Sequence, residues 1–141
     1  MIGDQRFERG LEVRREVLGS DYVDRSIADA TDFSRPLQEL VTECCWGTVW
    51  DRPGLDRRTR SLITIAVLTA CNHQHELGLH VEGARRNGCT DEEIQEALLH
   101  VAMYCGIPAA VAAFRTAQPV VAAPRNTAPA GAPNEPSDNG L

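Results

Sequence analysis

The segment CNHQHELGLH, residues 71–80, holds three of the four histidines of the chain and a glutamate, next to a long apolar run. A zinc-protease helix carries two histidines four positions apart on one face. His75 and His80 are five positions apart, which puts them about 140° apart around a helix and excludes that site. His73, Glu76 and His80 instead have i, i+3, i+7 spacing and share one helix face. We interpret these three as an acid–base group, and His75 as an ordinary surface residue or a hydrogen-bonded core residue.

The composition excludes several classes of protein. A length of 141 residues suits one domain, and 43% apolar residues are enough for a core. The net charge of −6 and the lack of a basic stripe argue against nucleic-acid binding. The chain has no lysine, which excludes Schiff-base chemistry by a lysine side chain. The N-terminus is charged and no apolar run could span a membrane, so we expect a cytoplasmic protein that does not bind membranes.

The five cysteines form no recognisable redox or metal motif. Cys44 and Cys45 are adjacent, Cys71, Cys89 and Cys105 are scattered, and no C-x-x-C occurs. This excludes a dithiol redox motif and a zinc knuckle. We interpret most of these cysteines as free thiols that pack as small hydrophobic residues.

The spacing of apolar residues predicts an all-α fold of about six to seven helices. Helices are expected over residues 6–19, 22–30, 35–51, 56–71, 71–87, 91–106 and 107–123, and the two that meet at residue 71 are expected to be continuous. Residues 62–70 are apolar nearly all round, which predicts a buried central helix. Asn87 and Gly88 form a stop signal, and Thr90 with Glu93 forms a capping box at the start of the next helix.

Two further features concern the ends and the assembly of the chain. Residues 1–122 are expected to form the helical domain, whereas 123–141 are rich in Pro, Ala and Asn and predict a disordered tail. The helix over 62–70 and the helix after Thr90 carry more apolar surface than a small monomer can hide. We therefore expect a homo-oligomer in which helices pack across subunits.

Two long segments, FSRPLQELVTECCWGTVWDRPGLDRRTRSLITIAVLTA and HELGLHVEGARRNGCTDEEIQEALLHVAMYCGIPAAVAAFR, resemble the carboxymuconolactone decarboxylase family. The resemblance covers nearly all of residues 5–120. It implies a compact helical domain of the alkylhydroperoxidase D-like type, decarboxylation without a cofactor or metal, and a ring-shaped oligomer, usually a hexamer, with a trimer as the alternative. The implied substrate is a small lactone carboxylate.

The resemblance also assigns roles to the histidine segment. Alkylhydroperoxidase D-like proteins carry C-x-x-C and a histidine four residues later, at the positions of His73, Glu76 and His80. Acid–base groups thus replace the dithiol that peroxidase chemistry needs. His80 is expected to stabilise an oxyanion or donate a proton. Glu76 would set its tautomer or shuttle the proton, and His73 would meet the substrate carboxylate.

Other site residues are expected on the neighbouring helices. Glu43 is a weaker acid–base candidate, and Arg60 and Trp46 are expected to bind the substrate, with Arg60 near an anion. Arg57 and Arg58 are interpreted as members of surface or intersubunit ion pairs.

The implied reaction converts 4-carboxymuconolactone to the enol-lactone of β-ketoadipate, in the protocatechuate branch of aromatic catabolism. The chain departs from the family pattern at His73, Gly78 and Glu82, where the family tends to be basic, and at Cys45, where tyrosine is usual. A decarboxylase or isomerase of a related lactone or unsaturated acid in a biosynthetic pathway is therefore an alternative. A second alternative is a metal- or ligand-binding protein without catalysis, in which His73, Glu76 and His80 form the site.

Overall fold

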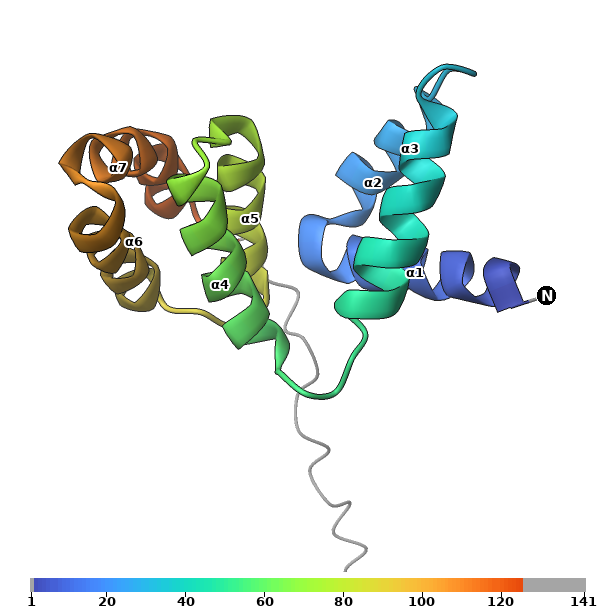
Figure 1. Cartoon of the computed structure of the whole chain (residues 1–141), viewed down its shortest axis with the longest axis horizontal. Coiled ribbons are helices and arrows are strands. Elements are labelled where there is room, and N and C mark those ends of the chain that lie inside the picture. The colour runs from blue at the N-terminus through green and yellow to red at the C-terminus, as the bar shows by residue number, and fades with distance from the viewer. Residues whose placement is uncertain (1, 126–141) are drawn as a thin grey trace, which may run out of the picture.

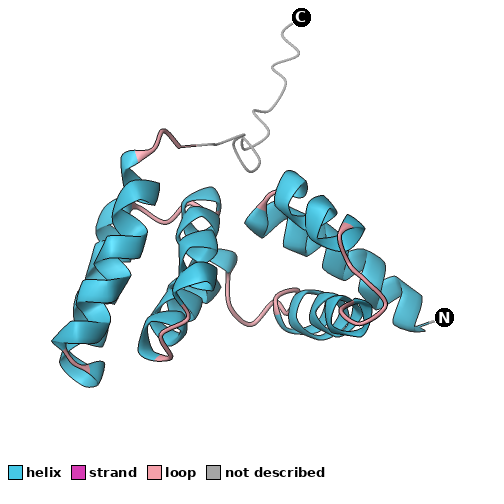
Figure 2. Cartoon of the chain, turned by 90° about the horizontal axis from the view of Figure 1, so that it is seen from above, coloured by secondary structure: helices cyan, strands magenta, loops and turns pink. Residues whose placement is uncertain are grey.

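The computed structural model describes residues 2–125, and all regular structure in this range is helical (Figures 1 and 2). The elements in chain order are α1 (Ile2–Leu18), α2 (Ser20–Ala28), α3 (Arg35–Leu40), the π-helix η1 (Val41–Val49), α4 (Arg57–Ala70), α5 (Gln74–Arg86), α6 (Asp91–Cys105) and α7 (Ile107–Ala122). The predicted all-α class is confirmed. None of these helices is long and apolar enough to cross a membrane.

The helices form two groups that are joined by the loop of residues 50–56. Figure 1 shows α1, α2 and α3 on one side and α4 to α7 on the other. Each group has its own apolar cluster. The first cluster includes Leu11, Val13, Val17, Val23, Trp46 and Trp50, and the second includes Ile65, Leu77, Val81, Ile94, Leu98 and Ala113.

Two glycines let α1 and η1 cross at close range. A Cβ atom on Gly10 would lie 2.0 Å from the carbonyl oxygen of Thr42, and one on Gly47 would lie 2.2 Å from that of Arg6. Such distances are far below van der Waals contact, so no larger residue fits without moving the helix backbones. This crossing fixes the place of η1, which carries two of the residues expected in the site, Glu43 and Trp46.

A third glycine and an arginine join the two groups. Gly83 on α5 faces the end of α1, where an added Cβ would lie 2.9 Å from the carbonyl oxygen of Val17. Arg86 donates from Nη1 to that same oxygen at 3.3 Å and from Nη2 to Glu82 at 2.7 Å. The last carbonyls of a helix have no partner within the helix, so Arg86 satisfies one of them and holds α5 against α1.

The predicted helix ends around residue 90 are confirmed. Asn87 ends α5, Gly88 has φ +90°, and Thr90 and Glu93 form the expected capping box at the start of α6. The predicted tail lies outside the described residues except for 123–125, so the division at residue 122 stays a prediction.

Three expectations about the helices are wrong in detail. The central helix α4 is buried on one face only, at Ser61, Ile65 and Thr69, whereas Ile63 and Val67 are exposed, because it packs against other helices on only one side within the chain. The expected helix over 35–51 is a short α-helix followed by a π-helix, whose wider turn buries Thr42 and Trp46 and exposes most of the apolar face that its sequence suggested.

The third correction concerns residues 71–73, which are not helical. The chain ends α4 at Ala70 and turns at Asn72, whose φ of +58° lies in the left-handed region, so α5 begins only at Gln74. His73 is therefore the N-cap residue of α5 and not part of a continuous helix face.

The crossing of α1 and η1 gives a prediction for glycine substitutions. Gly10→Ala should lower the free energy of unfolding by at least about 2 kcal/mol, because the methyl group forces the two backbones apart. Urea unfolding at pH 7.5 measures this value. Gly78→Ala is the matched control, since its Cβ would meet only Thr116 Cγ2 at 3.5 Å. It should be neutral or stabilising by about 0.5–1 kcal/mol. Equal effects of the two substitutions would contradict the close crossing.

Candidate functional site

His80 lies on α5 against two tryptophans from the other group of helices. Its ring stacks on Trp46 with centroids 5.9 Å apart and an interplanar angle of 3°, and on Trp50 at 6.1 Å and 27°. The two indole rings are themselves stacked at 4.9 Å. Both tryptophans are buried, so the imidazole rests on an apolar aromatic wall at the junction of the two groups.

Burial changes the protonation of this histidine. Loss of solvent lowers the pKa of His80 to about 4, and the charge of Glu76 opposes this shift only in part. Desolvation disfavours the charged form of a histidine, so the imidazole is neutral at pH 7. Its Nδ1 atom is buried and has no hydrogen-bond partner among the described residues. A neutral ring with an unsatisfied nitrogen can donate to, or accept from, a bound ligand.

The π-helix places the tryptophans under His80. Its hydrogen bonds span five residues, as in the bond of 2.9 Å from the Trp50 amide to the Cys45 carbonyl. Thr48 Oγ1 also donates to the carbonyl of Glu43, five residues back, at 2.9 Å. A π-helix is less favourable than an α-helix and occurs often at functional sites. Trp46 lies in η1 and Trp50 directly after it, four positions on and so nearly one turn away, and their indoles stack.

The structure brings together only some of the residues that the sequence suggested. Glu76 lies in the first turn of α5, is exposed, and is close enough to His80 to act on its pKa. Trp46 contacts His80 directly, and Glu43 is half-buried on the same π-helix. His73 is exposed ahead of the helix. Within residues 2–125 no group of three His, Cys, Asp or Glu side chains is arranged to hold a metal ion.

The three arginines at the start of α4 differ in their partners. Arg57 pairs with Glu16 and Arg58 with Glu93, which agrees with their interpretation as ion-pair residues. Arg60 is half-buried and donates from Nη2 to the carbonyl of Arg52 at 3.1 Å. Its Nε is buried and has no partner in the described part of the chain.

Two residues near this junction were not predicted as site residues. Trp50 completes the wall under His80, and the only signal for it was its spacing of four from Trp46. Arg14 on α1 is only 5% exposed. A charged residue in the apolar spacing of α1 was the signal for Arg14, because an arginine at such a position is rarely buried without a reason.

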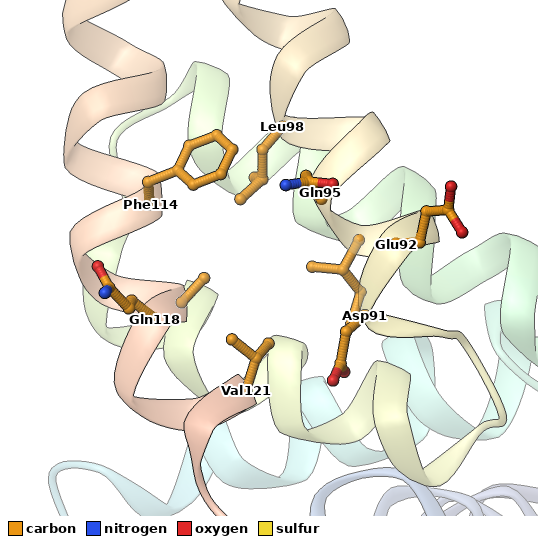
Figure 3. A pocket seen from close by; sticks show the side chains of 9 residues that line it. Asp91, Glu92, Gln95, Leu98, Phe114, Gln118 and Val121 are labelled. Carbon is orange, nitrogen blue, oxygen red and sulfur yellow. The ribbon is translucent and has the colours of Figure 1, made fainter.

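Two hollows lie near these elements. One, of about 460 Å³, lies between α6 and α7, with Ile94, Leu98 and Phe114 among its lining residues and Asp91 and Glu92 at its edge (Figure 3). It contains none of the expected site residues, and its carboxylates would repel an anionic substrate.

The second hollow is more polar and has a volume of about 420 Å³. Its lining includes Leu18 and Tyr22 from the first group of helices and Leu79, the neighbour of His80, from α5. Like the first hollow it contains none of the expected site residues, and it has two carboxylates, Asp21 and Glu82, but here Arg25 and Arg86 lie beside them. Tyr22 and Leu79 also pack against the apolar cluster that includes Trp46 and Trp50, so this is the hollow that we consider for a small substrate.

The low pKa of His80 predicts how stability depends on pH. Between pH 6.5 and about 4 the unfolded chain binds a proton at this residue and the folded chain does not. Its contribution to stability is complete above about pH 6.5 and is lost as the pH falls. Between pH 7.5 and 5 the wild type should lose about 2 kcal/mol more unfolding free energy than His80→Gln. Urea unfolding at both pH values measures this difference.

The exposed His75 provides the control for this experiment. His75→Gln should lose as much stability as the wild type over the same pH range. If His80→Gln lost as much unfolding free energy as the wild type between pH 7.5 and 5, the His80 imidazole would not be desolvated in the folded protein.

Comparison with known proteins gives a consistent family. A family model described as the carboxymuconolactone decarboxylase family matches residues 35–119. The nitrosuccinic acid decarboxylase of Metarhizium robertsii is 50% identical over 115 residues, which are 82% of this chain and 80% of that protein. The 4-carboxymuconolactone decarboxylase of Acinetobacter baylyi is 46% identical over 120 residues, which are 85% of this chain and 90% of that protein. Both relatives are named as decarboxylases, which confirms the predicted enzyme class, a carboxy-lyase. The chain therefore belongs to the carboxymuconolactone decarboxylase family.

Proposed function

We propose that this protein removes CO2, without a cofactor, from a small acid that carries its own electron sink. Our first candidate substrate is 4-carboxymuconolactone, which would place the enzyme in the protocatechuate branch of aromatic catabolism. The second is nitrosuccinic acid, which is favoured by the relative of that name at 50% identity. The observation that carries the proposal is the neutral, desolvated His80 with a free buried nitrogen against the two indoles.

The two candidate reactions have the same electronic course. In the lactone, the bond to the carboxylate breaks and its electron pair moves through the ring double bond to the lactone carbonyl oxygen. In nitrosuccinate, the pair moves to the nitro group on the same carbon and gives a nitronate. In both cases CO2 leaves, negative charge collects on an oxygen, and a proton later binds to carbon. The protein therefore has to stabilise an oxyanion and supply a proton, and no oxidant or reductant is consumed.

His80 suits the first task. A neutral imidazole can donate a hydrogen bond from its N–H group to a developing oxyanion. A positively charged ring would also stabilise the substrate carboxylate in the ground state, and this would slow the loss of CO2. The indole wall excludes water from one side of the ring, which strengthens a hydrogen bond formed there. The unpartnered Nδ1 gains a partner only when a ligand is present, so the interaction is available for the reaction.

Glu76 suits the second task. It lies one turn before His80, acts on the same ring, and is exposed to solvent, from which it can take up a proton after each turnover. Arg60 remains our candidate for contact with a substrate anion, since its Nε is free. The roles of His73 and Glu43 stay predictions.

We also propose that the protein works as a homo-oligomer in the cytoplasm, with a hexamer as the expected form. The support is a set of exposed apolar side chains on several helices. It includes Phe33, Leu37 and Leu40 near η1, Ile63 and Val67 on α4, and Met103 and Tyr104 at the end of α6. Exposed apolar surface of this extent favours burial between subunits. A mass of 15.4 kDa by light scattering would contradict this part of the proposal.

The proposed reaction predicts the effect of removing the imidazole. Purified protein is incubated with enzymatically generated 4-carboxymuconolactone or with nitrosuccinic acid, and CO2 release is followed. His80→Gln should lower kcat by about 100-fold or more on whichever substrate is used, the usual scale for losing an oxyanion donor or general acid. Its fold and oligomer size should be unchanged.

His75→Gln is the matched control, because it removes an exposed histidine from the same helix. It should keep turnover within a few-fold of the wild type. Absence of CO2 release from both substrates at high enzyme concentration would rule out both candidates. Equal losses in the two variants would place the reaction elsewhere in the protein.

A further inference from the structure

Arg14 carries a buried positive charge that has no negative partner. Its Nη1 donates to Gln38 Oε1 at 2.9 Å and to Thr42 Oγ1 at 3.3 Å, and both acceptors are neutral. Its Nε is buried without a partner, and both of these hydrogen bonds come from Nη1, so neither occupies Nη2. No carboxylate is among the groups that act on its pKa.

The other buried arginine shows what a structural role looks like. Arg85 is 7% exposed, and its guanidinium bonds Asp91 Oδ1 at 3.1 Å. It also donates to the carbonyl oxygens of Val120, Val121 and Ala123, which end α7. Its charge is thus paired and its donors are used. Burial of an unpaired charge costs far more than burial of a paired one, so Arg14 must have another reason to be retained.

The free edge of Arg14 has the geometry of a carboxylate site. Nε and Nη2 lie on one side of the guanidinium and can donate two parallel bonds to the two oxygens of a carboxylate. The opposite side is held by Gln38 and Thr42, which fixes the orientation of the fork. Burial lowers the pKa of Arg14, and an anionic ligand beside it would raise that pKa again.

The position of Arg14 connects it to the His80 site. Thr42 and Trp46 are the two buried residues of η1 and lie nearly one turn apart. Thr42 accepts a hydrogen bond from Arg14, and Trp46 stacks on His80. The lining of the hollow of about 420 Å³ does not include Arg14 itself but includes Leu18, which lies one turn along α1 from Arg14.

We propose that Arg14 binds the second carboxylate of the substrate, the one that is kept in the product. This inference rests on the proposed decarboxylase function. The carboxylate that leaves must lose its charge to become CO2, so a cation placed on it would stabilise the ground state and slow the reaction. A cation on the carboxylate that stays binds the ground state and the transition state alike and orients the substrate.

The test compares a substrate with two carboxylates and one with a single carboxylate. Nitrosuccinic acid has both groups, and 2-nitrobutanoic acid has the same nitro-activated carboxylate and lacks the second. We measure kcat/KM for each, corrected for uncatalysed loss of CO2, in the wild type and in Arg14→Gln. The wild type should prefer the diacid, and Arg14→Gln should reduce that preference by between about 10-fold and 100-fold, the scale of hydrogen bonds to a charged group.

Three variants complete the comparison. Arg15→Gln removes the adjacent arginine, which forms an exposed pair with Asp24, and should keep the preference for the diacid. Arg60→Gln tests the other arginine with a free Nε; if it removed the preference while Arg14→Gln kept it, the inference would be overturned. Arg14→Lys retains the charge but not the fork, so it should bind the diacid more weakly than the wild type even if Arg14→Gln fails to fold. Equal losses on both substrates in Arg14→Gln would also overturn the inference.

A binding measurement separates this inference from the proposed reaction. Succinate, which cannot be decarboxylated by this route, is titrated into the intact protein by calorimetry. Succinate binding to the wild type that is lost in Arg14→Gln supports the anion site. If neither candidate substrate reacts, that result overturns only the proposed function. Absence of succinate binding to the wild type, with no diacid preference in turnover, would overturn the inference about Arg14.

Discussion

The contact of His80 with Trp46 and Trp50 is the interaction on which the candidate site depends. It lies where the two groups of helices meet and combines side chains from α5 and from the segment that includes η1. Two places where helix backbones pack at very short distance make this contact possible. Gly10 and Gly47 let η1 lie directly on α1, and Gly83 lets α5 reach the end of the same helix. The same burial that packs the ring removes its solvent and keeps it neutral, so packing and chemistry are set by one constraint.

The arginines and the histidine that are buried or half-buried in this protein differ in whether their nitrogens have hydrogen-bond partners. Arg85 and Arg86 satisfy the free carbonyls at the ends of α7 and α1 and have carboxylate partners. Arg14, Arg60 and His80 are different, since each keeps a buried nitrogen without a partner in the described residues. Buried polar atoms are nearly always hydrogen-bonded in folded proteins. Arg14 and His80 are connected through Thr42 and Trp46 of η1, and Arg60 bonds the carbonyl of Arg52, two residues after Trp50.

Much of the fold followed from the sequence, because it depends on local signals. The helical class, the stop at Asn87 and the capping box at Thr90 are set by periodicity and by the chemistry of a few side chains. The π-helix and the turn at Asn72 were missed, because the first depends on a helix crossing that is distant in sequence and the second on a left-handed residue. His80 became a candidate from its spacing to Glu76. Its aromatic surroundings and the isolation of Arg14 were not, since both arise from contacts between elements that are far apart in the chain.

The central claim is that His80 is held neutral by the aromatic wall, and NMR of the imidazole nitrogens tests it most directly. Two-bond 1H–15N spectra of the labelled, intact protein follow the four histidines through a titration from pH 8 to 4.5, with His80→Gln used to assign the signal. The account predicts that the His80 ring stays neutral down to about pH 5, with a pKa of about 4. A His80 ring that is protonated at pH 6.5 or above would contradict it.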